Sequence, residues 1–256
     1  MCPAGAWWMA YVAAAEARRR AAGIASPPAD LFDLYLTDVA DPAGAFGGDW
    51  RRLAADVMGL MAAGFDTSAH AMAWTVHELL AHPEVTDRLR AEFASVFPAD
   101  GGGAVTAEHL AALPYATAVW QESLRKYPPV PLASRRALTA DLTLPSDGSV
   151  LPAGTTVAIP VYALHHNSST FPSPDVFDPS RWLAPPAGGG RRTAGTGAGA
   201  GAGAAAKASF MPFSAGGRNC PGQQLSGVEW KVVLGRLLLR YDLEAVDGAQ
   251  VTMETR

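Results

Sequence analysis

The sequence has little cysteine and no strong charge of either sign. Cys2 and Cys220 are the two cysteines among 256 residues, which is too few for a disulfide framework. The formal net charge of −4 gives no indication of affinity for nucleic acid. The apolar segment at residues 1–15 is shorter than the ~20 residues of a membrane span. Its positive charges follow it, the reverse of a signal peptide. These absences favour a globular protein with an amphipathic helix at its N-terminus.

One of the two cysteines lies among glycines and an arginine, in the segment FSAGGRNCPG at residues 213–222. Pro221 suits the first position of a helix, where its missing N–H group is not needed. Cys220 is therefore predicted at a helix N-terminus, where the helix dipole favours an anionic sulfur that can bind a metal. The apolar residues expected on one stripe of that helix are Leu225, Val228, Val232, Leu234, Leu237 and Leu238.

A lone cysteine is more often a small buried hydrophobic residue than a metal ligand. The ordered set of Phe213, Gly216, Arg218, Cys220 and Gly222 favours a ligand, because it resembles the haem-binding loop of the cytochrome P450 superfamily. The resemblance implies that Cys220 is the axial ligand of a haem iron, as thiolates are in that family. It also implies that Arg218 pairs with a haem propionate and that Phe213 covers the sulfur. The two glycines would let the loop turn tightly and approach the haem closely.

An apolar repeat with the period of an α-helix runs from residue 50 to residue 80. Residues 63–68, in its middle, are mostly small or polar and weaken helix propensity, so we expect a local opening there. From the residues alone, Asp66 would be solvated and Thr67 packed. The segment resembles the oxygen-binding helix of the family, however. That resemblance implies that Asp66 and Thr67 are the acid and the alcohol that relay protons.

Glu122 and Arg125 stand one turn apart on a predicted helix that two prolines end. This spacing is common and is weak evidence when taken alone. In the family, an arginine from a later segment joins the same pair, and residues 177–182 resemble that segment. The resemblance therefore implies a buried structural network of Glu122, Arg125 and Arg181 behind the haem, with no catalytic role.

A Pro–Gly turn followed by β-branched residues predicts a strand at residues 155–159. In the family, an arginine shortly after the Pro-rich turn contacts a haem propionate. Arg135 fits that position, and Arg136 is the alternative. The adjacent histidines His165 and His166 point apart and have no third ligand in view, so we expect them to stabilise a short helix or turn.

The matched features run from about residue 49 to residue 241 and correspond to the C-terminal portion of the family's catalytic domain. The expected fold is mainly α with small β sheets, a partial cytochrome P450 fold. Residues 1–256 would form one partial haem-thiolate domain, with a flexible Gly/Ala-rich insertion at residues 185–208. The resemblance implies that these 256 residues lack the N-terminal portion of the family domain, so we expect an uncovered apolar face and weak haem binding by this chain alone.

The resemblance implies a haem-dependent monooxygenase that inserts one atom of O2 into an apolar, lipid-like substrate. Electrons would come ultimately from NADPH through a reductase or ferredoxin docking near Arg218, Lys231 and Arg236. The alternatives are a haem-thiolate isomerase or dehydratase and an inactive truncated haem-binding fragment. Such isomerases tend to lack the acid–alcohol pair, so Asp66 and Thr67 favour the monooxygenase. A ligand thiolate needs a reducing compartment. A full-length form is expected to be membrane-associated through its N-terminal part, at the endoplasmic reticulum or a plastid.

Overall fold

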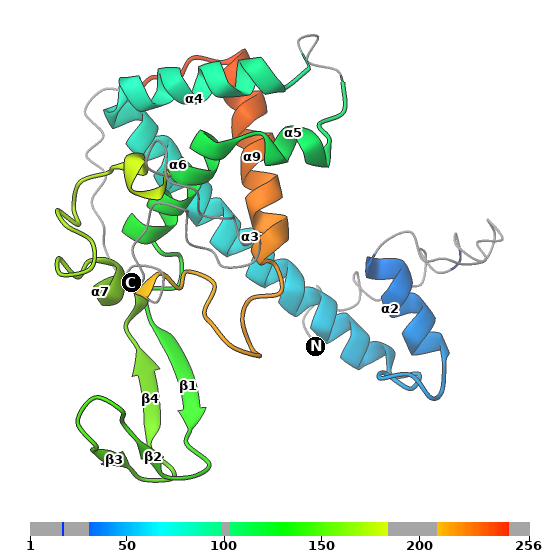
Figure 1. Ribbon diagram of the computed structural model, residues 1–256. Coiled ribbons are helices and arrows are strands. Elements are labelled where there is room, and N and C mark those ends of the chain that lie inside the picture. The colour runs from blue at the N-terminus through cyan, green and yellow to red at the C-terminus, as the bar shows by residue number, and fades with distance from the viewer. Residues whose placement is uncertain (1–16, 18–30, 99–102, 184–208, 246–256) are drawn as a thin grey trace. The chain divides into compact units, whose positions relative to one another are not determined.

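The structure is a computed structural model, and it describes residue 17 and residues 31–98, 103–183 and 209–245. Its contacts divide the chain into two compact units, residues 1–66 and residues 67–256. The boundary falls inside the long helix α3 (Trp50–Ala81), which is labelled in Figure 1. Each unit has a hydrophobic core of its own.

The first unit is built from α2 (Leu31–Ala40) and the first half of α3. Two aspartates organise the connection between these helices. The carboxylate of Asp38 accepts hydrogen bonds from the N–H groups of Ala45 and Phe46, and Asp49 accepts from Arg51 and Arg52 in the first turn of α3. The carboxylate of Asp49 thereby satisfies free amide groups at the start of α3. The core residues of this unit are Leu36, Val39, Phe46, Leu53, Ala54 and Val57.

The long helix predicted at residues 50–80 is confirmed by α3. The local opening expected at residues 63–68 is wrong, because the helix runs through this segment without interruption. Gly64 is exposed, and a Cβ there would meet no other atom within 4 Å. A glycine costs a helix only about 1 kcal/mol relative to alanine. That cost is too small to break a helix that continues for several turns on both sides.

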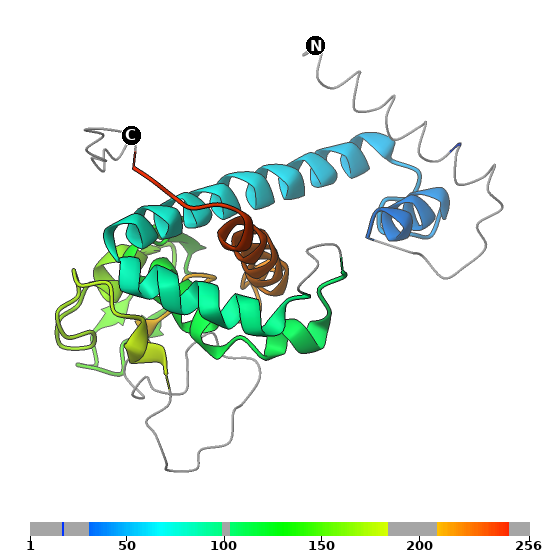
Figure 2. The ribbon, with the colours of Figure 1, turned by 90° about the horizontal axis from the view of Figure 1, so that it is seen from above.

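Helix α6 (Pro114–Lys126) lies at the centre of the second unit. It contacts α4 (Pro83–Val96) and α9 (Gln223–Arg240), which also contact each other (Figures 1 and 2). The approach of α9 to α4 depends on Gly235, since a Cβ there would lie 2.5 Å from a ring carbon of Phe97. The buried residues of α6 are Tyr115, Ala116, Ala118, Val119, Trp120, Gln121, Glu122, Ser123, Leu124 and Arg125. A helix buried on most of its surface must pair its polar groups internally.

Polar side chains link α6 to its neighbours. The carboxylate of Glu92, on α4, accepts hydrogen bonds from the N–H groups of Tyr115 and Ala116 at 2.8 and 2.7 Å. Helix α6 begins without a side-chain cap of its own, so this negative charge serves its N-terminus. On the other side, Thr75 of α3 lies 2.7 Å from the hydroxyl of Ser123 and accepts a hydrogen bond from the indole of Trp230. One threonine therefore joins α3, α6 and α9.

Among the described residues, the β structure consists of two short antiparallel pairs, which project from the helices of the second unit in Figure 1. Strand β1 (Ala133–Ala137) pairs with β4 (Thr156–Ile159), and β2 (Leu142–Thr143) pairs with β3 (Val150–Leu151). The predicted strand at residues 155–159 is confirmed by β4. The turn before it contains Gly154 at φ +89°, a conformation that glycine adopts without a steric penalty.

Helix α9 differs from its prediction at its start and on its apolar face. It begins at Gln223 with Gly222 as N-cap, so Pro221 is not its first residue. The buried residues of α9 are Trp230, Leu234, Gly235 and Leu238, whereas Leu225 and Val228 are exposed. The predicted stripe is therefore only partly the core-facing side, because the first two turns of the helix extend past the core.

Three short helices complete the described elements: α5 (Ala107–Ala111), α7 (Val161–His165) and the 3₁₀ helix η1 (Pro179–Trp182). In the part of the chain that the structure describes, no helix is long and apolar enough to cross a membrane. The predicted N-terminal helix and the predicted insertion at residues 185–208 both lie outside the described residues.

Candidate functional site

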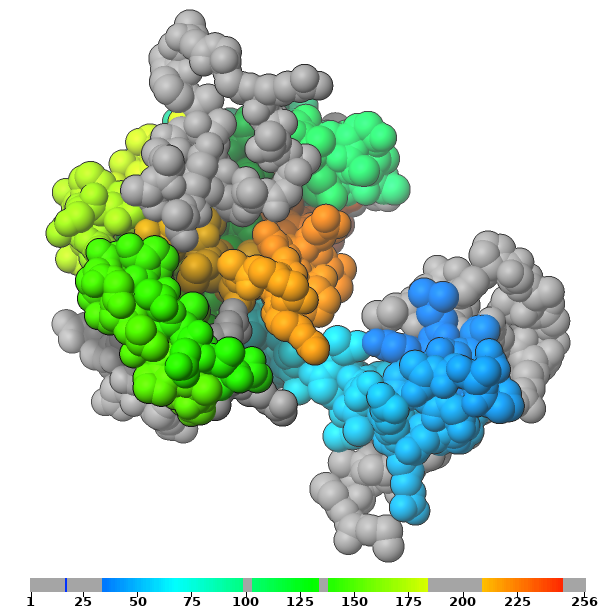
Figure 3. Space-filling model, turned by 60° about the horizontal axis from the view of Figure 1, so that its bottom comes forward, coloured from blue at the N-terminus to red at the C-terminus, as the bar shows by residue number. Residues whose placement is uncertain are grey.

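The loop at residues 211–220 presents Cys220 just before α9. Two backbone hydrogen bonds within the loop hold its second half together: the N–H group of Cys220 donates to the carbonyl of Phe213 at 2.9 Å, and that of Asn219 donates to the carbonyl of Gly216 at 3.2 Å. The Cys220 side chain is exposed. Figure 3 shows this loop, in gold, at the surface of the second unit. The sulfur is therefore accessible to a ligand outside the folded chain.

Two residues of this loop adopt the left-handed backbone conformation. Gly216 has φ +84° and Ser214 has φ +64°. Glycine adopts this conformation freely, whereas a serine there is strained. The hydroxyl of Ser214 is buried and has no hydrogen-bond partner in the described structure. Such strain persists only where surrounding contacts fix the backbone.

The surroundings of Cys220 fit a thiolate-ligated haem. Arg218 is exposed two residues before the cysteine. Leu225 and Val228, in the first two turns of α9, expose 61% and 43% of their surfaces, which leaves apolar area for a flat, largely apolar ligand. Phe213 is half-buried and packs against the main core. Cys220 precedes Gly222, the N-cap of α9, by two residues, so it lies just before the helix start and is not itself the N-cap.

Asp66 and Thr67 lie on consecutive positions of α3, at the boundary between the two units. Asp66 is exposed and Thr67 is half-buried. Immediately after Thr67, the chain approaches α9. Ser68, Ala69 and Met72 line one side of a cleft of about 260 Å³, and the other side includes Ser226 and Val233.

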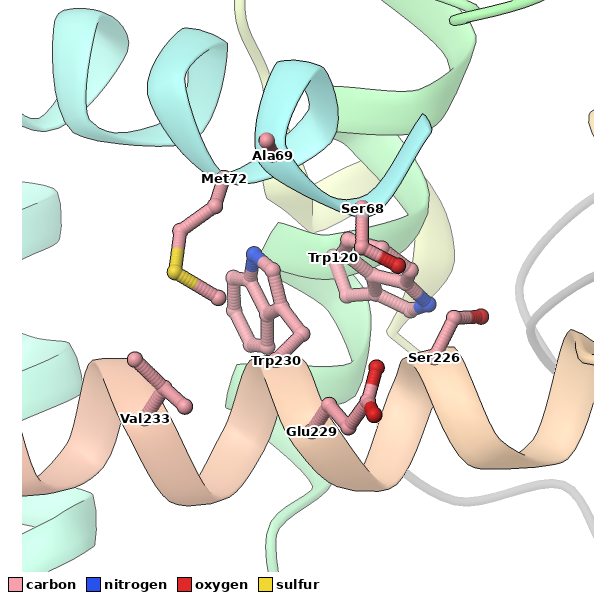
Figure 4. Close-up of a pocket in the computed structure, with 8 residues that line it drawn as sticks. All are labelled: Ser68, Ala69, Met72, Trp120, Ser226, Glu229, Trp230 and Val233. Atoms are coloured by element: carbon pink, nitrogen blue, oxygen red, sulfur yellow. The ribbon is translucent and has the colours of Figure 1, made fainter. Parts of the chain in front are cut away.

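Figure 4 shows this cleft, with the indoles of Trp120 and Trp230 at its base and the side chain of Glu229 rising from α9 toward them. The indole rings are 5.2 Å apart at their centroids. Neither Cys220 nor Thr67 lines the cleft. The cleft lies between α3 and α9. Its first lining residue on α9, Ser226, is six positions after Cys220, and its first lining residue on α3, Ser68, directly follows Thr67.

Glu122 and Arg125 form a fully buried bidentate ion pair. The guanidinium donates from Nε to Oε2 at 2.9 Å and from Nη2 to Oε1 at 2.8 Å, and both side chains are 0% exposed. Arg181 donates to the same Oε1 from its Nε at 3.2 Å. The structure thus brings together the three residues that were predicted to form a network. Glu122 and Arg125 lie in the interior, and Arg181 lies on η1. None of the three belongs to the cysteine loop.

Sequence reasoning missed two further donors to Glu122. The indole Nε1 of Trp182 donates to Oε2 at 2.8 Å, and the N–H group of Asp178 donates to Oε1 at 3.0 Å. A tryptophan directly after Arg181 was an available signal, since a buried indole N–H requires an acceptor. The remaining donors of Arg125 reach the carbonyls of His165 and Val176. This many partners offset the cost of burying two charges.

The other predicted contacts have different outcomes. Arg135 and Arg136 lie on β1, where the register is irregular, and their side chains lie outside the described part of the structure. Lys231 donates to the carbonyl of Leu110 at 3.1 Å, and Arg236 donates to the carbonyl of Gly103 at 2.5 Å. Both are half-buried. Of the three cations predicted to meet a redox partner, Arg218 is the exposed one.

The two adjacent histidines have separate partners. His166 lies 2.9 Å through Nδ1 from the carbonyl of Tyr162 and stacks on its ring, which stabilises the end of α7. His165 is fully buried, and burial lowers its pKa to about 4. Its Nε2 accepts a hydrogen bond from the N–H group of Met211 at 3.0 Å. Within the described ranges, no group of three or more His, Cys, Asp or Glu residues is placed to hold a metal ion.

The mainly helical fold and the exposed cysteine loop fit the class of protein expected from the sequence, and comparison with known sequences identifies the family. A cytochrome P450 family profile matches residues 12–256, so this chain belongs to the cytochrome P450 family. The predicted family and fold class are confirmed, and the family implies a haem cofactor.

Several curated relatives are 40% identical to this chain. Cytochrome P450 4A24 of Sus scrofa matches over 191 residues, and cytochrome P450 4A10 of Rattus norvegicus over 193; each match covers 75% of this chain and 34% of the relative. The taurochenodeoxycholic 6 alpha-hydroxylase of Sus scrofa matches over 189 residues, 74% of this chain and 33% of the relative. The chain spans about a third of the length of these relatives.

Proposed function

We propose that this chain carries the haem-binding part of a monooxygenase, with Cys220 as the axial iron ligand. The observation that supports this most is the exposed thiol at the end of a glycine-containing loop, held by the hydrogen bond from its own N–H group to Phe213. A buried cysteine could not reach a ligand outside the chain. A thiolate is also a stronger electron donor than the histidine or water ligands of many other haem proteins.

A bound haem would supply the activation of O2, from which one oxygen atom enters the substrate and the other leaves as water. The chain's own residues have simpler tasks. The Cys220 thiolate would hold the iron and raise its electron density. Arg218, together with Arg135 or Arg136, pairs with the haem propionates through charge-assisted hydrogen bonds. The Phe213 ring shields the sulfur from water.

Proton delivery falls to Asp66 and Thr67. The exposed carboxylate of Asp66 can take a proton from bulk water, and the half-buried hydroxyl of Thr67 can accept and pass on a proton. Neighbouring positions on a helix do not face each other. A water molecule is therefore needed to carry the proton between the two side chains.

The substrate class is an apolar, lipid-like molecule. Its support is the taurochenodeoxycholic 6 alpha-hydroxylase among the relatives. Electrons come from NADPH through a reductase or ferredoxin, and Arg218 is the exposed cation available to an acidic partner on the cysteine side.

The test is oxygen labelling. The 256-residue chain is supplied with haem, NADPH, a reductase, ¹⁸O2 and taurochenodeoxycholic acid as the probe substrate. Turnover should be low, because we expect this chain alone to bind haem weakly. The product that forms should contain one labelled oxygen atom, and none should form with Cys220→Ala. Cys2→Ala is the matched control, because it removes the other thiol of the chain and should leave turnover unchanged. Conversion of a hydroperoxide without NADPH or O2 would contradict the proposal and favour an isomerase.

A further inference from the structure

His165 stands between the buried ion pair and the cysteine loop. Its carbonyl accepts a hydrogen bond from Nη1 of Arg125 at 3.1 Å, and its ring accepts one from the Met211 N–H group at 3.0 Å. Met211 opens the loop that ends at Cys220, and its own carbonyl accepts from Ser214 at 3.0 Å. One residue thus joins the fixed interior to the start of the strained segment.

The chemical state of the ring suits this role. Burial lowers the pKa of His165 to about 4. The charge of Arg125 also lowers it, whereas the backbone of Arg125 and of Leu124 acts in the opposite direction without offsetting the burial, so the ring is neutral near pH 7. A neutral imidazole has one nitrogen that accepts a hydrogen bond and one that donates. The Met211 amide occupies the accepting Nε2, so the proton must be on Nδ1. That nitrogen is buried without a partner in the described structure.

A purely apolar side chain would pack in this position without burying an unpaired N–H group. The ring of His165 already lies against Phe210 and Phe171, at 5.3 and 6.4 Å between centroids. Burying an unpaired donor is unfavourable. What the histidine adds to the packing is an acceptor for the Met211 N–H group. A second contact holds the same segment, because the ring of Phe210 also packs on Trp182 at 4.5 Å between centroids.

We propose that His165 is a positioning residue that fixes the Cys220 loop to the Glu122–Arg125 pair by accepting the hydrogen bond of the Met211 amide. Its importance for the haem ligand rests on the proposed function, whereas its contact with the loop does not. When the Met211 end of the loop is fixed, the left-handed conformations of Ser214 and Gly216 set the path of the backbone that follows. Cys220 is then held in one position.

The experiment compares His165→Leu, which removes the acceptor, with His165→Gln, whose amide oxygen can replace Nε2. Amide hydrogen exchange is measured on the full 256-residue chain without haem. We expect the Met211 amide to exchange about tenfold faster in His165→Leu and to stay protected in His165→Gln. His166→Leu is the matched control, because His166 bonds only within α7 in the described contacts and should leave Met211 unchanged. Unchanged exchange at Met211 in a folded His165→Leu would overturn the proposal.

If His165→Leu does not fold, His165→Gln is compared with the shorter His165→Asn, whose amide oxygen cannot reach Met211. Protection in the glutamine variant and about tenfold faster exchange in the asparagine variant support the anchor; equal exchange in both overturns it.

A second measurement adds haem and records the carbon-monoxide spectrum of the reduced chain. The thiolate signature should be lost in part in His165→Leu and restored in His165→Gln. A signature that survives Cys220→Ala contradicts the proposed ligand, and the exchange result is independent of it.

Discussion

The Glu122–Arg125 pair and the Cys220 loop differ in nearly every physical respect although they belong to the same unit. The pair is 0% exposed, and both carboxylate oxygens of Glu122 accept more than one hydrogen bond. The loop exposes its thiol, contains two left-handed residues and leaves the hydroxyl of Ser214 without a partner in the described structure. The first region is saturated, whereas the second is held at its ends and open where a ligand would bind.

The buried pair therefore serves the stability of the fold, whereas the exposed thiol is available for binding a ligand. A buried charge pair stabilises one geometry because removing either partner strands the other charge. An exposed ligand contributes little to the fold and can be committed to binding. The connection between the two regions runs through His165 and Trp182, which contact the pair on one side and Phe210 or Met211 on the other.

The largest expected difference lies in the free energy of unfolding of two variants. Glu122→Gln leaves Arg125 buried without its counter-charge and should cost about 3–5 kcal/mol. Cys220→Ala changes an exposed side chain and should stay within about 0.5 kcal/mol of the original chain. Urea unfolding of the haem-free chain measures both. Similar losses in the two variants would remove the distinction between the regions.

The pH dependence of stability tests the link at His165. In the unfolded chain its pKa is 6.5, and burial lowers the folded value to about 4. As the pH falls, the unfolded state therefore binds a proton before the folded state does. The contribution of the neutral, buried His165 to the free energy of unfolding is full above pH 6.5 and is lost as the pH falls toward 4. The loss over this window is about 3 kcal/mol. His165→Gln should lack this component in urea unfolding at several pH values; an identical pH profile would show that the ring is not buried as described.

The two buried tryptophans Trp182 and Trp230 allow a comparison between a hydrogen bond to a charged acceptor and one to a neutral acceptor. Trp182→Phe removes a hydrogen bond to the Glu122 carboxylate, which should cost about 2 kcal/mol, and Trp230→Phe removes one to the Thr75 hydroxyl, which should cost about 1 kcal/mol. Thermal and urea unfolding give the comparison. The opposite ranking would mean that the Glu122 network is less important for the fold than its contacts indicate.

The smallest effects come from one substitution made at two glycines. Gly216→Ala forces a side chain into a left-handed conformation and should destabilise the chain by about 1 kcal/mol. Gly64→Ala meets no neighbouring atom on α3 and should stabilise it by about 0.5–1 kcal/mol. Unfolding midpoints should therefore move in opposite directions. Movement in the same direction would show that the loop backbone is not held at Gly216.

Features with a local cause could be predicted from the sequence. The period of α3, the prolines after α6 and the turn before β4 act over a few residues, and each prediction is confirmed. The resemblance placed Arg181 beside Glu122 correctly. The contacts of Trp182, His165 and Phe210 could not be predicted, because they join segments separated by up to 60 positions. The opening in α3 was predicted wrongly because propensity was weighed without the long helix around it.

The most direct test of the central claim is the coordination of iron in the haem-loaded chain. X-ray absorption at the iron edge distinguishes a sulfur neighbour from nitrogen or oxygen. We expect one sulfur atom bound to iron in the original chain and in Cys2→Ala, and none in Cys220→Ala. A shell of nitrogen and oxygen alone in the original chain, or a sulfur that persists in Cys220→Ala, would contradict it.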